Sequence, residues 1–167
     1  MKNKVNAVCE QGPLMGTVNE GVMIFLDIPY AETGGRFADA KPPRKWSKIR
    51  DCSRPGPIFP QPPSRLDFVQ GAYSQGLEQS EVAFRLNIYT PDLEGSLPVL
   101  FWIHGVGFTT GGCALQNYSG APLAASGRCV VVAVNYRLGI LGNLYIPGLS
   151  DGMQSVKDLQ TALFWVK

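Results

Sequence analysis

The sequence predicts an α/β protein, and three observations support this class. Residues 97–103 and 129–134 are nearly continuous apolar runs, as expected for strands that are buried on both faces of a sheet. Residues 154–167 repeat apolar side chains at spacings of three and four, which indicates an amphipathic helix. Strands that alternate with loops and helices are typical of a sheet with helices packed against it.

The first predicted element is a hairpin within residues 14–28. Its two β-rich runs lie on either side of Asn19-Glu20-Gly21, a sequence that favours a tight turn. Residues 31–80 follow, and more than half of the 13 prolines lie between Pro42 and Pro63. Each proline removes a hydrogen-bond donor, so we expect an irregular excursion there. It should pack through five large side chains: Trp46, Phe59, Leu66, Phe68 and Tyr73.

The remaining predicted elements follow a regular pattern. Strands are predicted over residues 84–90, 97–103 and 129–134, and the last is the strongest because its β-branched residues favour a pleated surface. A short helix is predicted over residues 121–126 and a longer one over residues 154–167. The apolar stripe of the longer helix comprises Val156, Leu159, Ala162, Leu163 and Val166.

The helical cover predicted for this sheet is incomplete. Two strands that are buried on both faces need helices on both sides, yet only one substantial helix is predicted. We therefore expect residues 1–167 to be the N-terminal part of one larger domain. It should hold an N-terminal hairpin and an incomplete, mostly parallel central sheet.

Composition and charge exclude several classes of function. Hydrophobic residues make up 45% of the chain and charged residues 17%, which is typical of a globular protein. The net charge of +2 is too small to indicate binding to nucleic acid or to an anionic membrane. The largest basic cluster is mixed with acidic residues and is interpreted as a solvated face. It comprises Lys41, Arg44, Lys45, Lys48, Arg50 and Arg54.

No cofactor or metal is expected. The four cysteines contain no Cys-x-x-Cys pair, and His104 is the single histidine, so a zinc site is not indicated. No phosphate-binding glycine motif follows a strand, which excludes the common nucleotide and flavin folds. The first residues lack the apolar core of a signal peptide, so we expect a cytoplasmic protein with free thiols.

The glycine-rich segment after residues 97–103 is the most informative for chemistry. His104-Gly105-Val106-Gly107-Phe108 follows a predicted buried strand directly. Such a turn can leave successive backbone N–H groups unpaired and directed at one point, as in an oxyanion hole that stabilises developing negative charge. Glycine permits the close approach and the positive φ that this requires. A plain glycine-rich turn explains the same residues, so both interpretations stay open on this segment alone.

Seven short motifs follow one another along nearly the whole chain. They are Gly16-Thr-Val, Asp27-Ile-Pro-Tyr-Ala31, Arg36-Phe37 with Pro42-Pro43 and Trp46, Ser80-Glu81 with Leu86-Asn-Ile-Tyr-Thr-Pro91, residues 97–108, residues 131–142, and Ala162-Leu-Phe-Trp-Val166. In this order they resemble the N-terminal part of the type-B carboxylesterases. These α/β-hydrolases include bacterial para-nitrobenzyl esterases and the cholinesterases. One such match is unspecific, whereas seven in order are specific to the family.

The resemblance implies a serine carboxylic ester hydrolase that works through an acyl-enzyme. It places Gly105, Val106 and Gly107 at the oxyanion-hole loop, with the N–H groups of the last two as donors, and gives His104 a structural role. Valine replaces the family's glycine at position 106, and its branched Cβ resists a left-handed backbone. We therefore expect an altered acyl pocket or a weakened oxyanion hole.

The resemblance also implies that the nucleophile, acid and base would follow Lys167. The chain by itself is then expected to be inactive, with a small-molecule carboxylic ester as the substrate of the complete protein and a complementary C-terminal fragment as a partner. The resemblance also implies that a disulfide found in many members of the family is absent here, since its two positions are Phe59 and Ala83.

Two other interpretations stay open. Because the family also contains cholinesterase-like interaction proteins, the chain could be a non-catalytic binding module. Alternatively, Gly148-Leu-Ser-Asp-Gly152 matches Gly-x-Ser-x-Gly, which would make Ser150 the nucleophile of a minimal hydrolase. A nucleophile elbow needs a buried strand immediately before it, and Leu144–Ile146 is too short and precedes Pro147, so the sequence argues against this assignment.

Overall fold

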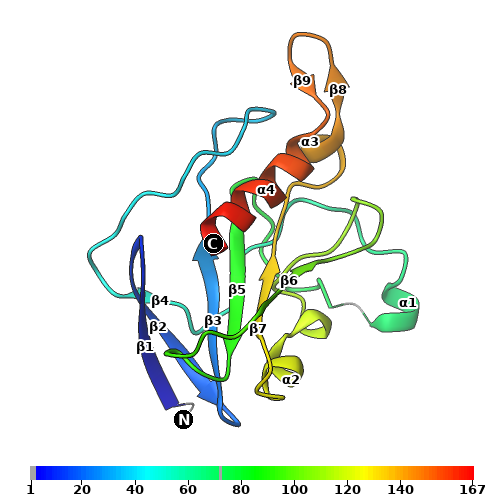
Figure 1. Ribbon diagram of the computed structural model, residues 1–167. Coiled ribbons are helices and arrows are strands. Elements are labelled where there is room, and N and C mark those ends of the chain that lie inside the picture. The colour runs from blue at the N-terminus through cyan, green and yellow to red at the C-terminus, as the bar shows by residue number, and fades with distance from the viewer. Residues whose placement is uncertain (1–2, 72) are drawn as a thin grey trace.

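The computed structural model describes residues 3–71 and 73–167 as a sheet with a few helices (Figure 1). The seven-stranded sheet has the order β1-β2-β3-β5-β7-β6, and β4 pairs with β2 outside this path. Its strands are Asn3–Cys9 (β1), Gly12–Asn19 (β2), Val22–Pro29 (β3), Arg50–Asp51 (β4), Arg85–Thr90 (β5), Val99–Ile103 (β6) and Val130–Val134 (β7). The helices are Asp67–Gln70 (α1), Gln116–Tyr118 (a 3₁₀ turn), Ala121–Ala124 (α2), Gly139–Asn143 (α3) and Gln154–Val166 (α4). A separate two-stranded sheet pairs Tyr145–Ile146 (β8) with Ser150–Asp151 (β9).

The predicted hairpin is confirmed as β2 and β3. Its two turn residues, Glu20 and Gly21, have φ values of 49° and 80°. Two successive positive φ angles match the right-handed twist of the flanking strands, which is why this short turn closes the hairpin. The hairpin is extended by β1, which pairs antiparallel with β2 along its whole length.

The α/β class is confirmed, but the directions of the strands correct the expectation of a mostly parallel sheet. Among the described residues, only β6 with β7 and β2 with β4 run parallel. The pairs β1–β2, β2–β3, β3–β5 and β5–β7 are antiparallel. The sheet is mixed because its first strands are joined by short turns, whereas the crossover from β6 to β7 carries α2 and returns in the same direction.

The two apolar strands that the sequence predicts differ in how deeply they are buried. The β7 strand lies between two neighbours, and residues 131–134 are buried, as predicted. The prediction that residues 97–103 are covered on both faces is wrong. Val99, Trp102 and Ile103 are 49%, 41% and 48% exposed. The reason is that β6 ends the strand order and pairs only with β7, which leaves one edge and part of both faces open.

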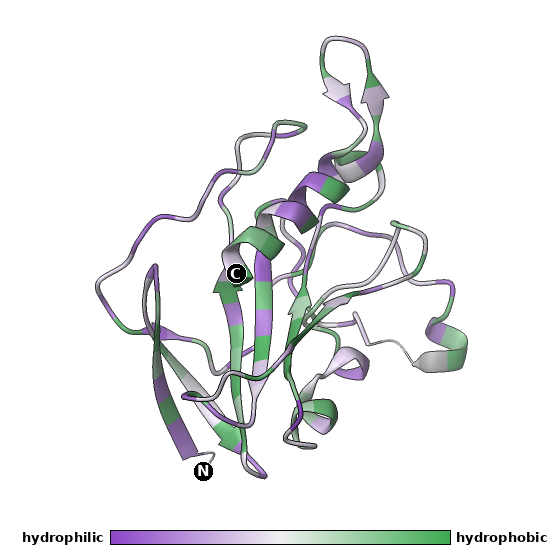
Figure 2. Cartoon of the chain, in the orientation of Figure 1, coloured by the Kyte–Doolittle hydropathy of each residue, from purple (hydrophilic) through white to green (hydrophobic). Residues whose placement is uncertain are grey.

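Two cores pack against opposite faces of the sheet. Val132 and Val134 join the larger core, to which α4 contributes Ala162, whereas Val131 joins the smaller core with Ala124 of α2. Alternate residues of one strand point to opposite faces, so the two helices cover opposite sides (Figure 1). Figure 2 shows hydrophobic residues along β3 and β7, whereas β5 alternates between hydrophobic and hydrophilic residues.

Helix α4 is confirmed, but its apolar stripe is only partly buried. Ala162 is fully buried, and Leu159 and Val166 pack against the core. Val156 and Leu163 are 45% and 54% exposed. Among the described residues, nothing covers this side of α4.

A buried ion pair fixes α4 to the chain that follows β7. The guanidinium of Arg137 donates two hydrogen bonds to the carboxylate of Asp158, at 2.8 and 2.7 Å, and the Arg137 backbone N–H donates a third at 3.0 Å. Both side chains are buried, and the remaining guanidinium nitrogen donates to the Ala38 carbonyl. Since a buried charge is costly without a partner, each residue depends on the other.

The excursion over residues 31–80 is largely irregular, as predicted. Phe59 is buried and packs edge-on against Phe84 with ring centroids 5.1 Å apart, and Trp46 packs against the larger core. The prediction that Leu66, Phe68 and Tyr73 also pack is wrong, because they are 36%, 87% and 41% exposed. Trp46 and Phe59 therefore anchor the excursion to the core, whereas the part around α1 lies on the surface.

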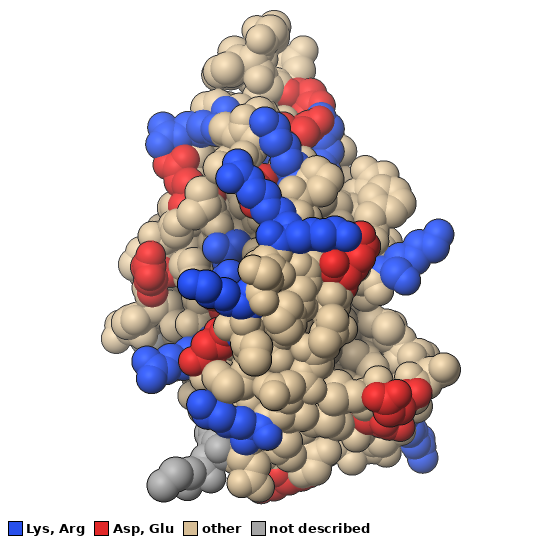
Figure 3. All heavy atoms as spheres, turned by 90° about the vertical axis from the view of Figure 1, so that its left-hand side faces the viewer, with Lys and Arg blue, Asp and Glu red and all other residues tan. Residues whose placement is uncertain are grey.

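The basic cluster within this excursion is part of a mixed surface. Figure 3 shows Lys and Arg interspersed with Asp and Glu on this side of the molecule. Three ion pairs join basic residues of this cluster to acidic neighbours: Arg44 with Glu32, Lys45 with Glu10, and Arg50 with Asp27. The interpretation as a solvated face therefore agrees with the structure.

Candidate functional site

The glycine-rich loop leaves the sheet where β6 ends. Val106, Gly107 and Phe108 are consecutive residues with positive φ, at 78°, 61° and 59°. Only glycine adopts this region readily, and a bulky residue there costs about 1–3 kcal/mol unless its surroundings hold it. The sequence leads us to expect that Val106 resists a left-handed backbone, and the loop nevertheless imposes one.

The backbone N–H groups of residues 105–108 in this loop have no hydrogen-bond acceptor within residues 3–71 and 73–167. The next residue is paired, since the N–H and the hydroxyl of Thr109 donate to the Val106 carbonyl at 3.2 and 2.8 Å. The loop exposes Gly105, Gly107 and Phe108. Consecutive free N–H groups on an open loop can bind an anionic oxygen.

Contacts on both sides hold the loop in this shape. The Tyr136 hydroxyl donates to the His104 carbonyl at 2.6 Å, where the loop begins. The Gly139 N–H donates to the Phe108 carbonyl at 2.7 Å. The segment between β7 and α3 therefore supports the loop from one side. These two contacts were not predicted from the sequence, because they join residues more than 30 positions apart.

His104 has a structural position, in agreement with the role that the resemblance implies. Its ring is 2% exposed and stacks on Tyr136, with centroids 4.4 Å apart, and on Tyr118 at 6.2 Å. Neither ring nitrogen has a hydrogen-bond partner among the described residues, so the ring is held by stacking. Burial lowers the pKa of His104 to about 4, against a smaller opposing effect of the Gly105 backbone. The imidazole is therefore neutral near pH 7.

A mostly apolar cavity of about 590 Å³ lies beside the loop. Thr109 lines it together with the start of α3, where Leu138 is buried and Ile140 is exposed. Arg36 and Glu81 form an ion pair at the same cavity. The cavity is large enough for the apolar part of a small ligand, and it reaches the loop at Thr109, the residue that follows the free N–H groups.

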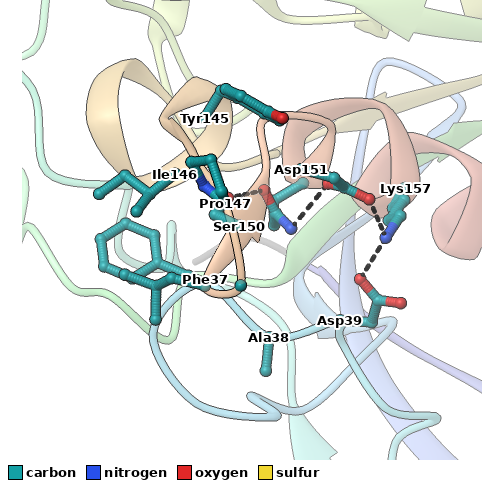
Figure 4. A pocket seen from close by; sticks show the side chains of 12 residues that line it. Phe37, Ala38, Asp39, Tyr145, Ile146, Pro147, Ser150, Asp151 and Lys157 are labelled. Carbon is teal, nitrogen blue, oxygen red and sulfur yellow. Dashed lines mark hydrogen bonds and ion pairs between the residues drawn. The ribbon is translucent and has the colours of Figure 1, made fainter.

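Ser150 lies elsewhere, in the β8–β9 hairpin. It is 7% exposed, and its hydroxyl donates to the Gln154 side-chain oxygen at 2.8 Å. The strand before it, β8, has two exposed residues and is not a buried strand that could present a nucleophile. Figure 4 shows Ser150 in a separate pocket of about 440 Å³, where Lys157 bridges Asp39 and Asp151. The structure places no histidine in this pocket, which argues against Ser150 as a nucleophile.

Two further searches cover the described residues. In residues 3–71 and 73–167, no group of three or more His, Cys, Asp or Glu side chains is arranged to hold a metal ion. Within the same residues, no helix has both the length and the apolar character needed to span a membrane.

The model of the carboxylesterase family matches residues 2–167. The chain belongs to the carboxylesterase family. It is 43% identical over 162 residues to a probable N-octanoylanthranilate hydrolase of Rhodococcus erythropolis, covering 93% of this chain and 35% of that protein. It is 34% identical over 165 residues to the para-nitrobenzyl esterase of Bacillus subtilis, covering 95% of this chain and 33% of that protein. A solved thermophilic PNB esterase superposes with a TM-score of 0.85 at 34% identity, covering 99% of this chain and 35% of the other.

The chain therefore spans about a third of the length of the carboxylesterases that it matches. The family match confirms the resemblance predicted from the seven motifs, and the coverage of about a third of each relative fits an N-terminal portion. Phe59 and Ala83, the two positions at which the resemblance implies a disulfide in the family, are both buried here. The sequence did not identify Gln61 as part of the loop's surroundings.

Proposed function

We propose that this chain supplies the oxyanion-hole loop of a serine carboxylesterase that hydrolyses small carboxylic esters. The N–H groups of Val106 and Gly107 are the donors, and Gly105 begins the loop. The free N–H groups in a left-handed turn beside an apolar cavity carry this proposal. A tetrahedral intermediate places negative charge on the former carbonyl oxygen, and preorganised N–H donors stabilise that charge.

The apolar cavity supports esters with an apolar acyl or aromatic part. The names of two relatives fit this class, since one is a para-nitrobenzyl esterase and another a phenmedipham hydrolase. In this proposal the attacking serine, the acid and the base come from polypeptide outside these 167 residues. The loop alone stabilises charge but has no nucleophile to activate, so the chain by itself is inactive.

The partner in this proposal is a complementary C-terminal carboxylesterase fragment. The open edge of β6, the exposed apolar side chains of β6 and those of α4 support such a partner. These side chains are Val99, Trp102, Ile103, Leu163 and Phe164. The same surface also supports the second candidate, a non-catalytic interaction module related to the cholinesterases. A cytoplasmic location belongs to the proposal too, and the four free cysteines fit it.

The test uses p-nitrophenyl esters and two polypeptides. We expect no hydrolysis above buffer with the chain alone, and hydrolysis when it is mixed with the remaining two-thirds of the Bacillus para-nitrobenzyl esterase. Val106→Gly should retain this activity because the donor is a backbone N–H. Val106→Pro has no N–H and its ring holds φ near about −65° in place of 78°, so it removes both the donor and the left-handed turn and should lower kcat at least about 10²- to 10³-fold. Full activity of Val106→Pro would contradict the assigned donor.

Fluorophosphonate labelling separates the remaining interpretations. The chain alone should remain unlabelled, and Ser150→Ala should change nothing. Labelling that this variant abolishes would instead support Ser150 as a nucleophile. A partner that binds the chain specifically while the mixture stays inactive would favour the interaction module.

A further inference from the structure

Gln61 reaches across 50 residues to hold the far end of the glycine-rich loop. Its side-chain oxygen accepts a hydrogen bond from the Gly111 N–H at 2.7 Å, and its side-chain nitrogen donates to the Gly111 carbonyl at 2.7 Å. The same nitrogen also donates to the Phe59 carbonyl at 3.0 Å. Both polar atoms of the amide are therefore used, and both polar groups of the Gly111 backbone are satisfied by one side chain.

The Gln61 amide is itself held in place. Its backbone N–H donates to the side-chain oxygen of Gln79 at 2.9 Å. Phe59, whose carbonyl takes the third bond, is buried against Phe84. The contact therefore ties the loop to a fixed part of the irregular segment.

Gly111 is a suitable point for such a contact. Its φ is 123°, and a Cβ at this position would lie 2.2 Å from Nδ1 of His104. The Gly111 backbone therefore packs directly against the buried imidazole. Tyr136 fixes the start of the loop at the His104 carbonyl, and Gln61 fixes its end at Gly111. The backbone of the six residues between His104 and Gly111 must therefore span a fixed distance.

Between the two fixed ends lie the strained residues. Val106 and Phe108 have positive φ, which an unrestrained chain would relax toward negative φ at a gain of about 1–3 kcal/mol each. Such strain persists only where surrounding contacts fix the backbone. The Gly139 N–H holds the Phe108 carbonyl within the loop, and the neutral Gln61 amide holds both polar groups of the Gly111 backbone at its far end.

We infer that Gln61 is a positioning residue, which holds residues 106–108 in the left-handed conformation that presents their free N–H groups. The inference rests on the proposed function for its consequence in catalysis, but the conformational claim stands on the contacts alone. Gln61 does not itself touch the reacting atoms. It acts through Gly111.

The conformational test uses the 167-residue chain and one-bond Cα–Hα couplings, which distinguish positive from negative φ. Gln61→Met keeps the volume and removes all three hydrogen bonds, so residues 106 and 108 should lose positive φ. Gln160→Met, at an exposed glutamine of α4, is the matched control and should leave the couplings unchanged. Unchanged couplings in Gln61→Met would overturn the inference.

Gln61→Glu keeps the test decisive if Gln61→Met does not fold. Its ionised carboxylate accepts from the Gly111 N–H but faces two carbonyl oxygens as an acceptor, so the loop should relax near pH 7.5. Protonation gives it an O–H that can donate to the Gly111 carbonyl, so positive φ should return as the pH is lowered toward about 5. Positive φ that does not depend on pH in Gln61→Glu would overturn the inference.

The activity measurement uses this chain mixed with the remaining two-thirds of the Bacillus para-nitrobenzyl esterase. Gln61→Met should lower kcat about 10- to 100-fold, because misplaced donors weaken the stabilisation of the transition state. Gln61 also lines the apolar cavity, so a change in KM alone would show that it acts on substrate binding and not on the donors. If the couplings change but kcat does not, Gln61 positions the loop and the loop is not the oxyanion hole. If the couplings do not change, the positioning role is wrong whatever the activity shows.

Discussion

Acid should destabilise this protein through His104. Burial lowers the pKa of this imidazole to about 4, whereas the unfolded chain has the ordinary value of about 6.5. Between these two values the unfolded chain binds a proton that the folded chain does not. The free energy of unfolding therefore has its full value above about pH 6.5 and decreases as the pH falls toward about 4.

The two pKa values set the size of the effect. Linkage gives a loss of about 2 kcal/mol in the free energy of unfolding between pH 7 and pH 5. The matched variant is His104→Phe, which keeps a flat ring between Tyr118 and Tyr136 but binds no proton. Other groups titrate in both proteins, so the difference between their pH profiles isolates His104.

Urea unfolding followed by tryptophan fluorescence at a series of pH values measures this difference. We expect the unfolding free energy of His104→Phe to depend less on pH than that of the wild type, by about 2 kcal/mol over this range. Parallel profiles for the two proteins would refute the reasoning. They would mean that the folded protein accommodates the imidazolium in spite of the burial of the ring.

Two further substitutions test the packing around the loop and α4. Asp158→Asn should lower the free energy of unfolding by about 3–5 kcal/mol, measured by urea titration, because it leaves the buried charge of Arg137 without its partner. A loss below about 1 kcal/mol would show that water reaches the pair. Gly111→Ala should cost about 2–4 kcal/mol, because its Cβ meets the His104 ring and its φ is strained. Gly148→Ala, with a φ of 78° and open space around it, is the control and should cost about 1 kcal/mol in the same titration.

Local sequence signals determined much of the fold. The Asn19-Glu20-Gly21 turn was predictable because glycine readily adopts one of the two positive φ angles that the hairpin needs, and the short turn imposes the other on Glu20. The β7 strand was predictable from its continuous apolar run, α4 from apolar periodicity, and the family from seven motifs in order. The glycine-rich loop was predictable as a candidate site because glycine spacing after a strand is a local pattern.

Tertiary structure decided the rest. An apolar run indicates a strand but not its place in the sheet, so the exposure of β6 followed only from the strand order. The burial of Asp158 depended on Arg137, which lies 21 residues earlier, and helix periodicity carries no information on such a partner. The conformation of the glycine-rich loop also depended on tertiary contacts. Its residues were visible in the sequence, but the left-handed backbone of Val106 and the amide of Gln61 that meets Gly111 depend on contacts between distant segments.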